Sequence, residues 1–156
     1  MYRLAQPFLF AALVLAGCAG HRIPGTEIKD TADSRAVIAT IDTYRRAAER
    51  RDAATVLSLV SPKYFDKSAS GDPADDINYD QLKSRIANDY KKITALRLDI
   101  GVKKVDIDGE AATAYVLYDE RYRIATKAGQ VAKQASDVHR MQFAREGGAW
   151  HFVSGL

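Results

Sequence analysis

The sequence predicts an α+β fold, with three N-terminal helices packed on the concave face of a strongly curved antiparallel sheet of about four strands. Two patterns predict it. Apolar residues recur at helical spacing in the first half of the chain, and they alternate with polar residues between hairpin-type turns in the second half. The composition, 47% hydrophobic and 28% charged over 156 residues, is typical of one folded domain with an ordinary core.

The first 17 residues have the pattern of a signal peptide. Arg3 gives a short basic start, and the apolar run Phe8 to Leu15 is too short to span a bilayer as a helix of about 20 residues. The run ends in residues 15–18 (LAGC), which resemble the lipobox of bacterial lipoproteins. This resemblance implies that Cys18 is acylated and becomes the first residue of the mature chain. A leader that is retained uncleaved is the alternative.

Lipidation at Cys18 implies a chain that is held at a membrane. Several acyl chains, at about 0.8 kcal/mol per buried methylene, attach a protein almost irreversibly. Ala19 follows the cysteine, where lipoproteins of the inner membrane often carry aspartate, so the resemblance implies the outer membrane, facing the periplasm. We assign residues 1–17 to the signal peptide, residues 18–32 to a lipidated flexible tether, and residues 33–156 to the folded domain.

The first helix is predicted to run from Asp33. Val37, Ile41, Tyr44 and Ala48 fall on one face of this helix, and charged residues occupy the rest of its surface. The apolar face predicts that the helix packs against the sheet.

Two further helices are predicted from their capping residues. Asp52 can cap a short helix that ends at Ser61-Pro62. Residues 64–76 are rich in Ser, Gly, Asp and Pro and predict a loop. Asn78 and Gln81 form a capping box for the third helix. Its apolar stripe consists of Leu82, Ile86, Tyr90 and Ile93.

Three turn signals, at residues 108–109, 128–129 and 147–148, predict four antiparallel strands. The apolar positions are even up to Val102 and odd from Val105, so a bulge at Lys103-Lys104 is expected to restore the alternation. The cross-strand partners that this alternation favours are Ile107 with Glu110, Leu98 with Tyr118, Val116 with Met141, Phe143 with Phe152, and Trp150 with Arg145.

The order of these elements and two segments of sequence are similar to the nuclear transport factor 2-like superfamily. The segments are Tyr44 to Asp66 and the C-terminal run Phe143 to Val153 (FAREGGAWHFV). The resemblance covers about residues 33–156 and implies a cone, with three helices on the concave side of a bent sheet around a pocket. The fold hosts enzymes, binding modules and scaffolds, so the resemblance specifies shape better than chemistry.

The enzymes that the segment Tyr44 to Asp66 resembles are ketosteroid isomerase and the SnoaL-like polyketide cyclases. Tyr44 matches a tyrosine of the isomerase oxyanion hole. The general-base aspartate of the isomerases would fall near Ser68, with Asp66 as the nearest carboxylate, and no residue clearly matches their second oxyanion donor. Tyr44 is also compatible with a core position in which its hydroxyl finds a partner at the cavity edge.

The predicted register brings four polar groups to one end of the apolar face. Tyr118 is expected opposite His139, and Glu120 opposite Asp137. Two facing carboxylates repel, so one could keep a proton near neutral pH, or the pair could hold a cation. With an imidazole beside them they could do acid–base work. The alternative is that the sheet flares there and leaves all four groups solvated.

The opposite face of the sheet carries a small apolar patch. An exposed patch of this kind usually contacts another protein surface. Because the family often dimerises through its sheet, a homodimer is the first expectation and an envelope protein the second, with ordinary surface residues as the alternative. The patch consists of Tyr115, Leu117, Val138 and Val153, with Arg140 beside it.

Several classes of function are not supported by the sequence. Cys18 is the single cysteine, so no intramolecular disulfide can form. The three histidines are far apart in sequence, and no phosphate-binding glycine loop precedes a helix, so neither a metal nor a cofactor is expected. A net charge of +3 without a basic stripe gives no argument for nucleic acid.

The sequence therefore predicts a membrane-anchored, non-catalytic module of the bacterial envelope that binds a small apolar ligand or an envelope protein. The alternative is an isomerase- or cyclase-type enzyme that uses Tyr44 with Asp66 or with the Tyr118, Glu120, Asp137 and His139 group.

Overall fold

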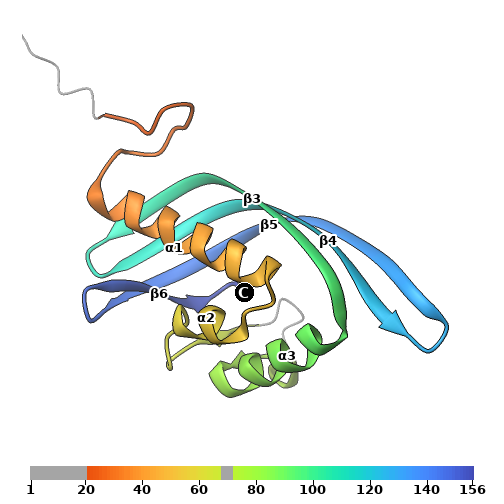
Figure 1. The fold of residues 1–156 in the computed structure, drawn as a ribbon. Coiled ribbons are helices and arrows are strands. Elements are labelled where there is room, and N and C mark those ends of the chain that lie inside the picture. Colours follow the sequence, from red (N-terminus) through yellow and green to blue (C-terminus); the bar gives the residue numbers. More distant parts are fainter. Residues whose placement is uncertain (1–20, 68–71) are drawn as a thin grey trace, which may run out of the picture.

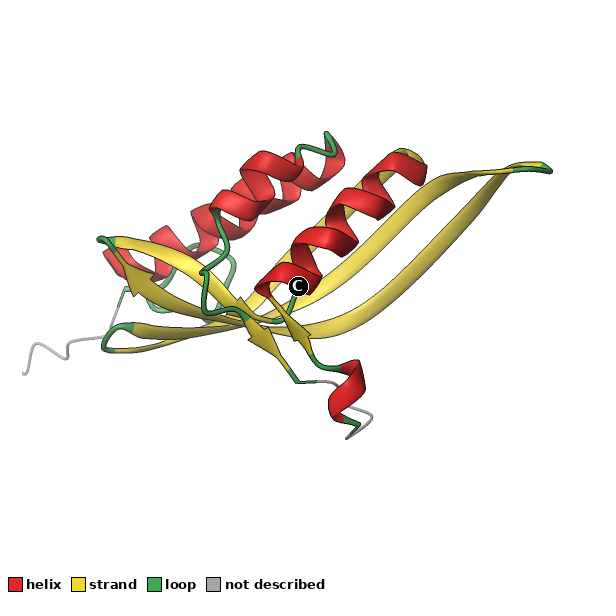
Figure 2. Ribbon diagram, turned by 90° about the horizontal axis from the view of Figure 1, so that it is seen from below, coloured by secondary structure: helices red, strands yellow, loops and turns green. Residues whose placement is uncertain are grey.

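The computed structural model describes residues 21–67 and 72–156, and it confirms the predicted α+β fold. Cys18 and Ser68 lie outside these residues. All three helices lie on one side of a bent, open sheet (Figures 1 and 2). The helices are α1 (Ala32–Glu49), α2 (Ala53–Ser58) and α3 (Tyr79–Lys92). The sheet pairs its strands in sequence order: β3 (Ile93–Asp108), β4 (Ala111–Thr126), β5 (Gly129–Glu146) and β6 (Ala149–Ser154).

The predicted caps begin the second and third helices. The Asp52 carboxylate accepts a hydrogen bond from the Thr55 N–H at 3.0 Å. Asn78 and Gln81 exchange hydrogen bonds in the expected capping box. The predicted loop, residues 64–76, contains the short strand β1 (Phe65–Asp66) and a 3₁₀ turn at Pro73–Asp75. β1 pairs with β2 (Ile77–Asn78), which directly follows the loop.

Residues 21–31, part of the predicted flexible tether of residues 18–32, are folded. Arg22 pairs with Lys29 across a turn, and the Ile28 side chain is only 2% exposed. Thr31 then caps α1, because its hydroxyl accepts the Ser34 N–H at 3.1 Å. The folded part of the chain therefore begins before residue 33.

The expected bulge is present in β3. The pairing of β3 with β4 shifts between Val102 and Lys104. Because of this extra residue, even-numbered side chains such as Leu98 and odd-numbered ones such as Val105 reach the same concave face. The strand thereby stays apolar on its inner side over its whole length.

Two of the three hairpins are shifted by two residues from the predicted register. The first loop is Gly109-Glu110, so Ile107 pairs with Ala112 instead of Glu110. Gly109 has φ of +56°, a value that suits glycine at the first loop position. The last hairpin is as predicted, with Phe143 opposite Phe152.

The second hairpin is corrected in the same way. Thr126 pairs with Gly129, and Val116 lies opposite His139 instead of Met141. A shift of two residues keeps each side chain on its predicted face, because strand side chains alternate with a period of two. Only the identity of the facing partners changes.

The core lies between α1, α2 and the concave face of the sheet. Tyr44 packs edge-on against Phe152, with ring centroids 5.5 Å apart, and Phe152 is in turn 4.5 Å from Phe143. The core residues from the helices include Val37, Ile41, Ala47, Ala48, Val56 and Leu82, and those from the sheet include Leu98, Ala112, Ala114, Val116, Met141 and Trp150.

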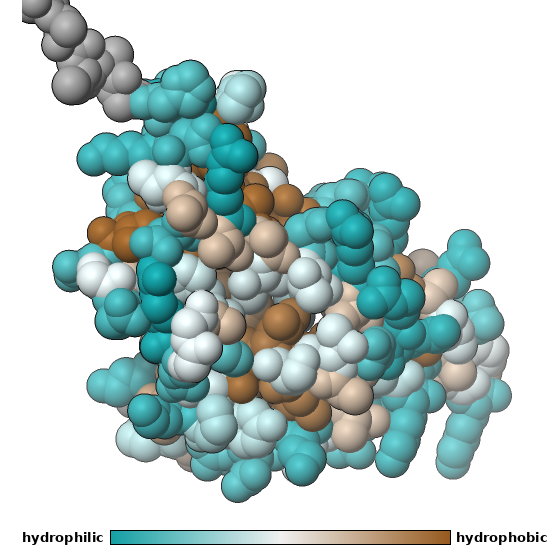
Figure 3. Space-filling model, turned by 60° about the vertical axis from the view of Figure 1, so that its left-hand side comes forward, coloured by the Kyte–Doolittle hydropathy of each residue, from teal (hydrophilic) through white to brown (hydrophobic). Residues whose placement is uncertain are grey.

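The hairpin of β4 and β5 extends beyond the helices (Figure 1). Residues 129–138 are exposed along it. The surface of the molecule is mostly hydrophilic, with hydrophobic side chains gathered near the centre of the face seen in Figure 3.

Candidate binding cavity

A cavity of about 420 Å³ opens between the helices and the distal part of the concave face. Tyr44 and Tyr90 line this cavity, whereas Phe143 and Trp150 pack in the core and are not part of its lining. Its apolar lining consists of Ala48, Val56, Leu82, Ile86, Ile93, Leu96, Ile124 and Leu156.

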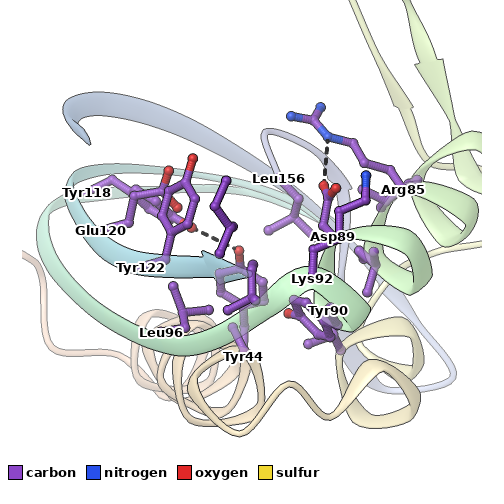
Figure 4. Close-up of a pocket in the computed structure, with 16 residues that line it drawn as sticks. Tyr44, Arg85, Asp89, Tyr90, Lys92, Leu96, Tyr118, Glu120, Tyr122 and Leu156 are labelled. Carbon is purple, nitrogen blue, oxygen red and sulfur yellow. Dashed lines mark hydrogen bonds and ion pairs between the residues drawn. The ribbon is translucent and has the colours of Figure 1, made fainter. Parts of the chain in front are cut away.

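Two tyrosines from different elements meet inside the cavity. The hydroxyl oxygens of Tyr44 on α1 and Tyr118 on β4 are 3.3 Å apart (Figure 4). Burial raises the pKa of Tyr44 well above its ordinary value, and it raises the pKa of Tyr118 to about 12. Both hydroxyls therefore keep their protons at neutral pH and can donate hydrogen bonds.

Glu120 lies on the same face of β4, two residues beyond Tyr118, and lines the same cavity (Figure 4). Partial burial raises the pKa of its carboxyl group, while the nearby His139 and Arg85 act in the opposite direction. A carboxyl group of this kind can accept a proton or a hydrogen bond from a ligand.

A charged group lies at the α3 side of the cavity, away from Tyr118 (Figure 4). Arg85 and Asp89 are one helical turn apart, with 3.8 Å between the guanidinium and carboxylate atoms. Lys92 lines the cavity near them. Polar groups thus stand at both ends of a lining that is otherwise apolar.

The predicted pair of facing carboxylates does not form. Glu120 lies opposite Ala135, and Asp137 lies opposite Tyr118. Asp137 is exposed, and its carboxylate accepts the N–H of Val138 at 2.7 Å. The cause is the two-residue shift of the second hairpin.

His139 is not directly opposite Tyr118, yet the two rings are in contact. They stack with centroids 4.5 Å apart and planes 1° from parallel. The half-buried imidazole therefore supports the ring of Tyr118 and does not line the cavity itself. Of the predicted polar group, Tyr118, Glu120 and His139 come together, and Asp137 does not join them.

Asp66 is placed outside the cavity lining, in a network that holds the C-terminus. Its carboxylate accepts hydrogen bonds from the hydroxyls of Ser154 at 2.7 Å and Tyr64 at 3.4 Å. The Tyr64 hydroxyl also contacts the backbone of Leu156. These contacts assign Asp66 a structural role beside the cavity.

Several lining residues were not predicted from the sequence. Tyr122 and Ile124 continue the alternation of Tyr118 and Glu120 on β4, so the period of two could have identified them. Arg85 and Asp89 flank the apolar stripe of α3 at a spacing of four residues, but that spacing is also common on solvated helix surfaces.

The predicted interface residues largely gather on the convex face. Tyr115 pairs with Arg140, and Leu117 pairs with Val138, so that the four form one cross-strand group. The exposed fractions of Tyr115, Leu117 and Val138 are 36%, 43% and 67%. Val153 is half-buried on β6.

Two further findings concern the described residues. Nowhere in 21–67 and 72–156 do three or more His, Cys, Asp or Glu side chains cluster in a way that could hold a metal ion. None of the helices in this part of the chain has the length and hydrophobicity needed to span a bilayer.

No protein-family model matches the chain, and no curated protein sequence does. Solved structures do match. A ketosteroid isomerase-like protein from Erwinia carotovora atroseptica has a TM-score of 0.65 at 15% identity, over 81% of this chain and 95% of that one. A candidate scytalone dehydratase from Novosphingobium aromaticivorans has a TM-score of 0.68 at 11% identity, over 79% and 80% of the two chains.

A third match is a candidate dehydratase of the nuclear transport factor 2-like family from Streptomyces avermitilis. Its TM-score is 0.61 at 18% identity, over 79% of this chain and 92% of that one. At such identities the likeness concerns the fold and leaves the chemistry of each protein to its own residues. The chain therefore has the fold of the nuclear transport factor 2-like proteins.

Proposed function

We propose that this protein is a membrane-anchored, non-catalytic binding module of the bacterial envelope, whose cavity takes a small apolar ligand. The observation that carries this proposal is the cavity itself. Its volume of about 420 Å³ is that of a small-molecule site, and most of its lining is aromatic or aliphatic. Apolar walls with a few polar groups are typical of sites that bind by burial and orient by hydrogen bonds.

The tyrosine pair indicates which polar atom the ligand carries. In a contact between two hydroxyls one donates and the other accepts, so one of the two protons of Tyr44 and Tyr118 remains free to donate. A carbonyl or hydroxyl oxygen at one end of an apolar ring system would accept it. The proposed ligand is therefore a ring-sized apolar molecule with an oxygen at one end.

The cavity proposal can be tested with the fluorescent apolar probe N-phenyl-1-naphthylamine. Ile86→Trp places a large side chain in the cavity and is expected to weaken probe binding at least tenfold. The matched control is Val131→Trp, on the exposed hairpin, which should bind the probe as the parent does. Equal binding by both variants would place the probe elsewhere and contradict the proposal.

Lipidation at Cys18, attachment to the outer membrane and exposure to the periplasm belong to the same proposal, and they rest on residues 1–19. An envelope protein is the second proposed binding partner of the module. The exposed convex patch of Tyr115, Leu117 and Val138 supports an association with another protein surface. The first candidate for that surface is a second copy of the chain.

An enzyme of the isomerase type is the second candidate function, and Glu120 is the observation that favours it. Its carboxyl group, with a raised pKa, faces the same cavity as the tyrosine pair. Glu120 could take a proton from the carbon next to a ketone, while a tyrosine hydroxyl donates to the ketone oxygen, and then return the proton. Deuterium uptake by a cyclic ketone, measured by NMR and lost in Glu120→Gln, would support this function. Deuterium uptake no faster than in buffer without the protein would contradict the enzyme function and leave ligand binding as the only proposed function.

A further inference from the structure

The outer edge of β5 is the part of the fold that the cavity does not use. From Gly129 to Met141 the strand pairs with β4 on one side, and no described strand pairs with it on the other, because β6 joins only at Gln142. The hairpin that carries this edge reaches past the helices (Figures 1 and 2). Such an edge presents unpaired N–H and C=O groups that can pair with another strand.

We propose that a second copy of this chain pairs with this edge, antiparallel and about a twofold axis at Ala135, so that Lys133 of each copy faces Asp137 of the other. In such an isologous contact, residues equally distant from the axis lie opposite each other. The pairing joins the two sheets into one continuous sheet across the two copies.

The backbone of β5 has the orientation that this register requires. The N–H of Val138 is bonded to the carboxylate of its neighbour Asp137, and the C=O of Arg140 lies against the backbone of Gly155 beyond the outer edge. On the same strand the N–H of Arg145 points the other way, to the C=O of Glu110. Even-numbered residues before Gln142 therefore direct their backbone groups outward.

An axis at Ala135 pairs even residues with even residues. Ala132 then faces Val138, and Gln134 faces Ser136, in the pairs that exchange backbone hydrogen bonds. Ala135 faces its own copy in a non-hydrogen-bonded pair, where side chains approach most closely and a small residue fits best. The Asp137 carboxylate, which serves the Val138 N–H in the single chain, is released to meet Lys133.

Neighbouring registers give poorer partners. An axis at Gln134 would place Asp137 against Val131, and an axis at Ser136 would place it against Ala135. Axes at Lys133 or Asp137 would bring like charges face to face, which destabilises a strand pair. Among these registers, only the axis at Ala135 places the positive charge of Lys133 opposite the negative charge of Asp137.

The C-terminal backbone limits the length of the free edge. The C-terminal backbone at Gly155 covers Arg140 so closely that a side chain at Gly155 would collide with the Arg140 carbonyl oxygen. The edge that remains for a partner is thus Gly129 to His139, and Ala135 lies within one residue of its midpoint. Val131 and Val138, which are 43% and 67% exposed, lose solvent contact in the pair.

Cysteine cross-linking tests the register directly. The full-length chain with Cys18→Ser has no other thiol, so an introduced cysteine can link only to its own copy. In a non-hydrogen-bonded pair the Cα atoms are about 4.5 Å apart, within the range that a disulfide spans. Ala135→Cys should cross-link at least tenfold faster than Val131→Cys, a control on the same strand and face. Faster linking at Gln134→Cys or Ser136→Cys, or no difference from the control, would overturn the proposal.

Charge reversal tests the contact between Lys133 and Asp137. In the Ala135→Cys background, Lys133→Glu or Asp137→Lys alone should slow cross-linking about tenfold, and the two together should restore it. Lys127→Glu, the same charge change at the exposed tip of the hairpin, should leave the rate unchanged. The proposal would be overturned if the double change failed to restore the cross-linking rate. It would also be overturned if Leu117→Lys abolished cross-linking while Lys133→Glu left it intact, because that result assigns the contact to the sheet face.

Discussion

At the scale of single residues, the cavity depends on how the hydroxyls of Tyr44 and Tyr118 satisfy each other. Tyr44 is 8% exposed, so its hydroxyl has little access to water and relies on the partner 3.3 Å away. A buried polar group without a partner costs about 1–3 kcal/mol, whereas a satisfied pair is close to neutral. The pair can therefore supply a donor to a ligand without destabilising the fold.

Removal of one hydroxyl should show this dependence. We expect Tyr118→Phe to lower the free energy of unfolding by about 1–3 kcal/mol, because the Tyr44 hydroxyl then stays buried and unpaired. The double variant with Tyr44→Phe should lose less than the sum of the two single variants. Urea unfolding measures all three, and Tyr122→Phe on the same cavity wall should stay within about 0.5 kcal/mol of the parent. Additive losses would mean that the two hydroxyls do not interact.

Glu120 should make stability depend on pH. Because burial raises its pKa in the folded protein above the ordinary value of 4.5, the folded state binds the proton more tightly than the unfolded state. The stability that Glu120 contributes is present at pH values below its pKa in the unfolded state. This stability is lost as pH rises through its pKa in the folded state. Glu120→Gln should remove this loss and melt at a higher temperature than the parent at pH 7. The difference should shrink below pH 4.5, and a variant that melts lower at pH 7 would contradict the assigned burial.

At the scale of elements, the segment before α1 belongs to the folded domain. Ile28 is 2% exposed and is held by the turn that joins Arg22 to Lys29. The sequence pattern of Gly, Pro and polar residues is typical of a linker, and it gave no periodicity from which the burial of one isoleucine could be predicted.

Truncation of the Ile28 side chain should therefore destabilise the whole domain. We expect Ile28→Ala to lower the free energy of unfolding by about 2–4 kcal/mol, since it removes a buried side chain and leaves a cavity. Ile23→Ala, at a half-buried position of the same turn, is the matched control and should lose less. Equal, small losses at both positions would show that residues 21–31 do not pack on the domain in solution.

The hairpins show how far a strand pattern can be interpreted. Alternation predicted the faces of all four strands and the bulge near Lys103, because a side chain on the wrong face would expose apolar surface. It could not separate two registers that differ by two residues, since both leave each side chain on the same face. That ambiguity produced the incorrect pairing of Glu120 with Asp137.

At the scale of the whole molecule, the proposed lipidation of Cys18 would hold the cavity at a membrane. Expression in a bacterial host should give a membrane-bound protein whose intact mass exceeds that of residues 18–156 by the mass of its acyl chains. The Cys18→Ser variant should lack this added mass and should leave the membrane fraction. An unmodified cysteine on the wild-type protein would contradict the proposed anchor.

The sequence by itself determined the fold class, the three helices with two of their caps, the bulge and the faces of the strands, because these follow from local hydrogen bonding and from the separation of apolar and polar side chains. Only the tertiary structure decided which side chains are in contact. It brought Tyr44 of α1 against Tyr118 of β4, stacked His139 on that ring, moved Asp137 out of the site and left a cavity where aromatic side chains could have filled the interior. The reason is physical: turn geometry fixes strand register to the residue, and the curvature of the sheet fixes the distance between helices and strands, and neither quantity changes the alternation that a sequence displays.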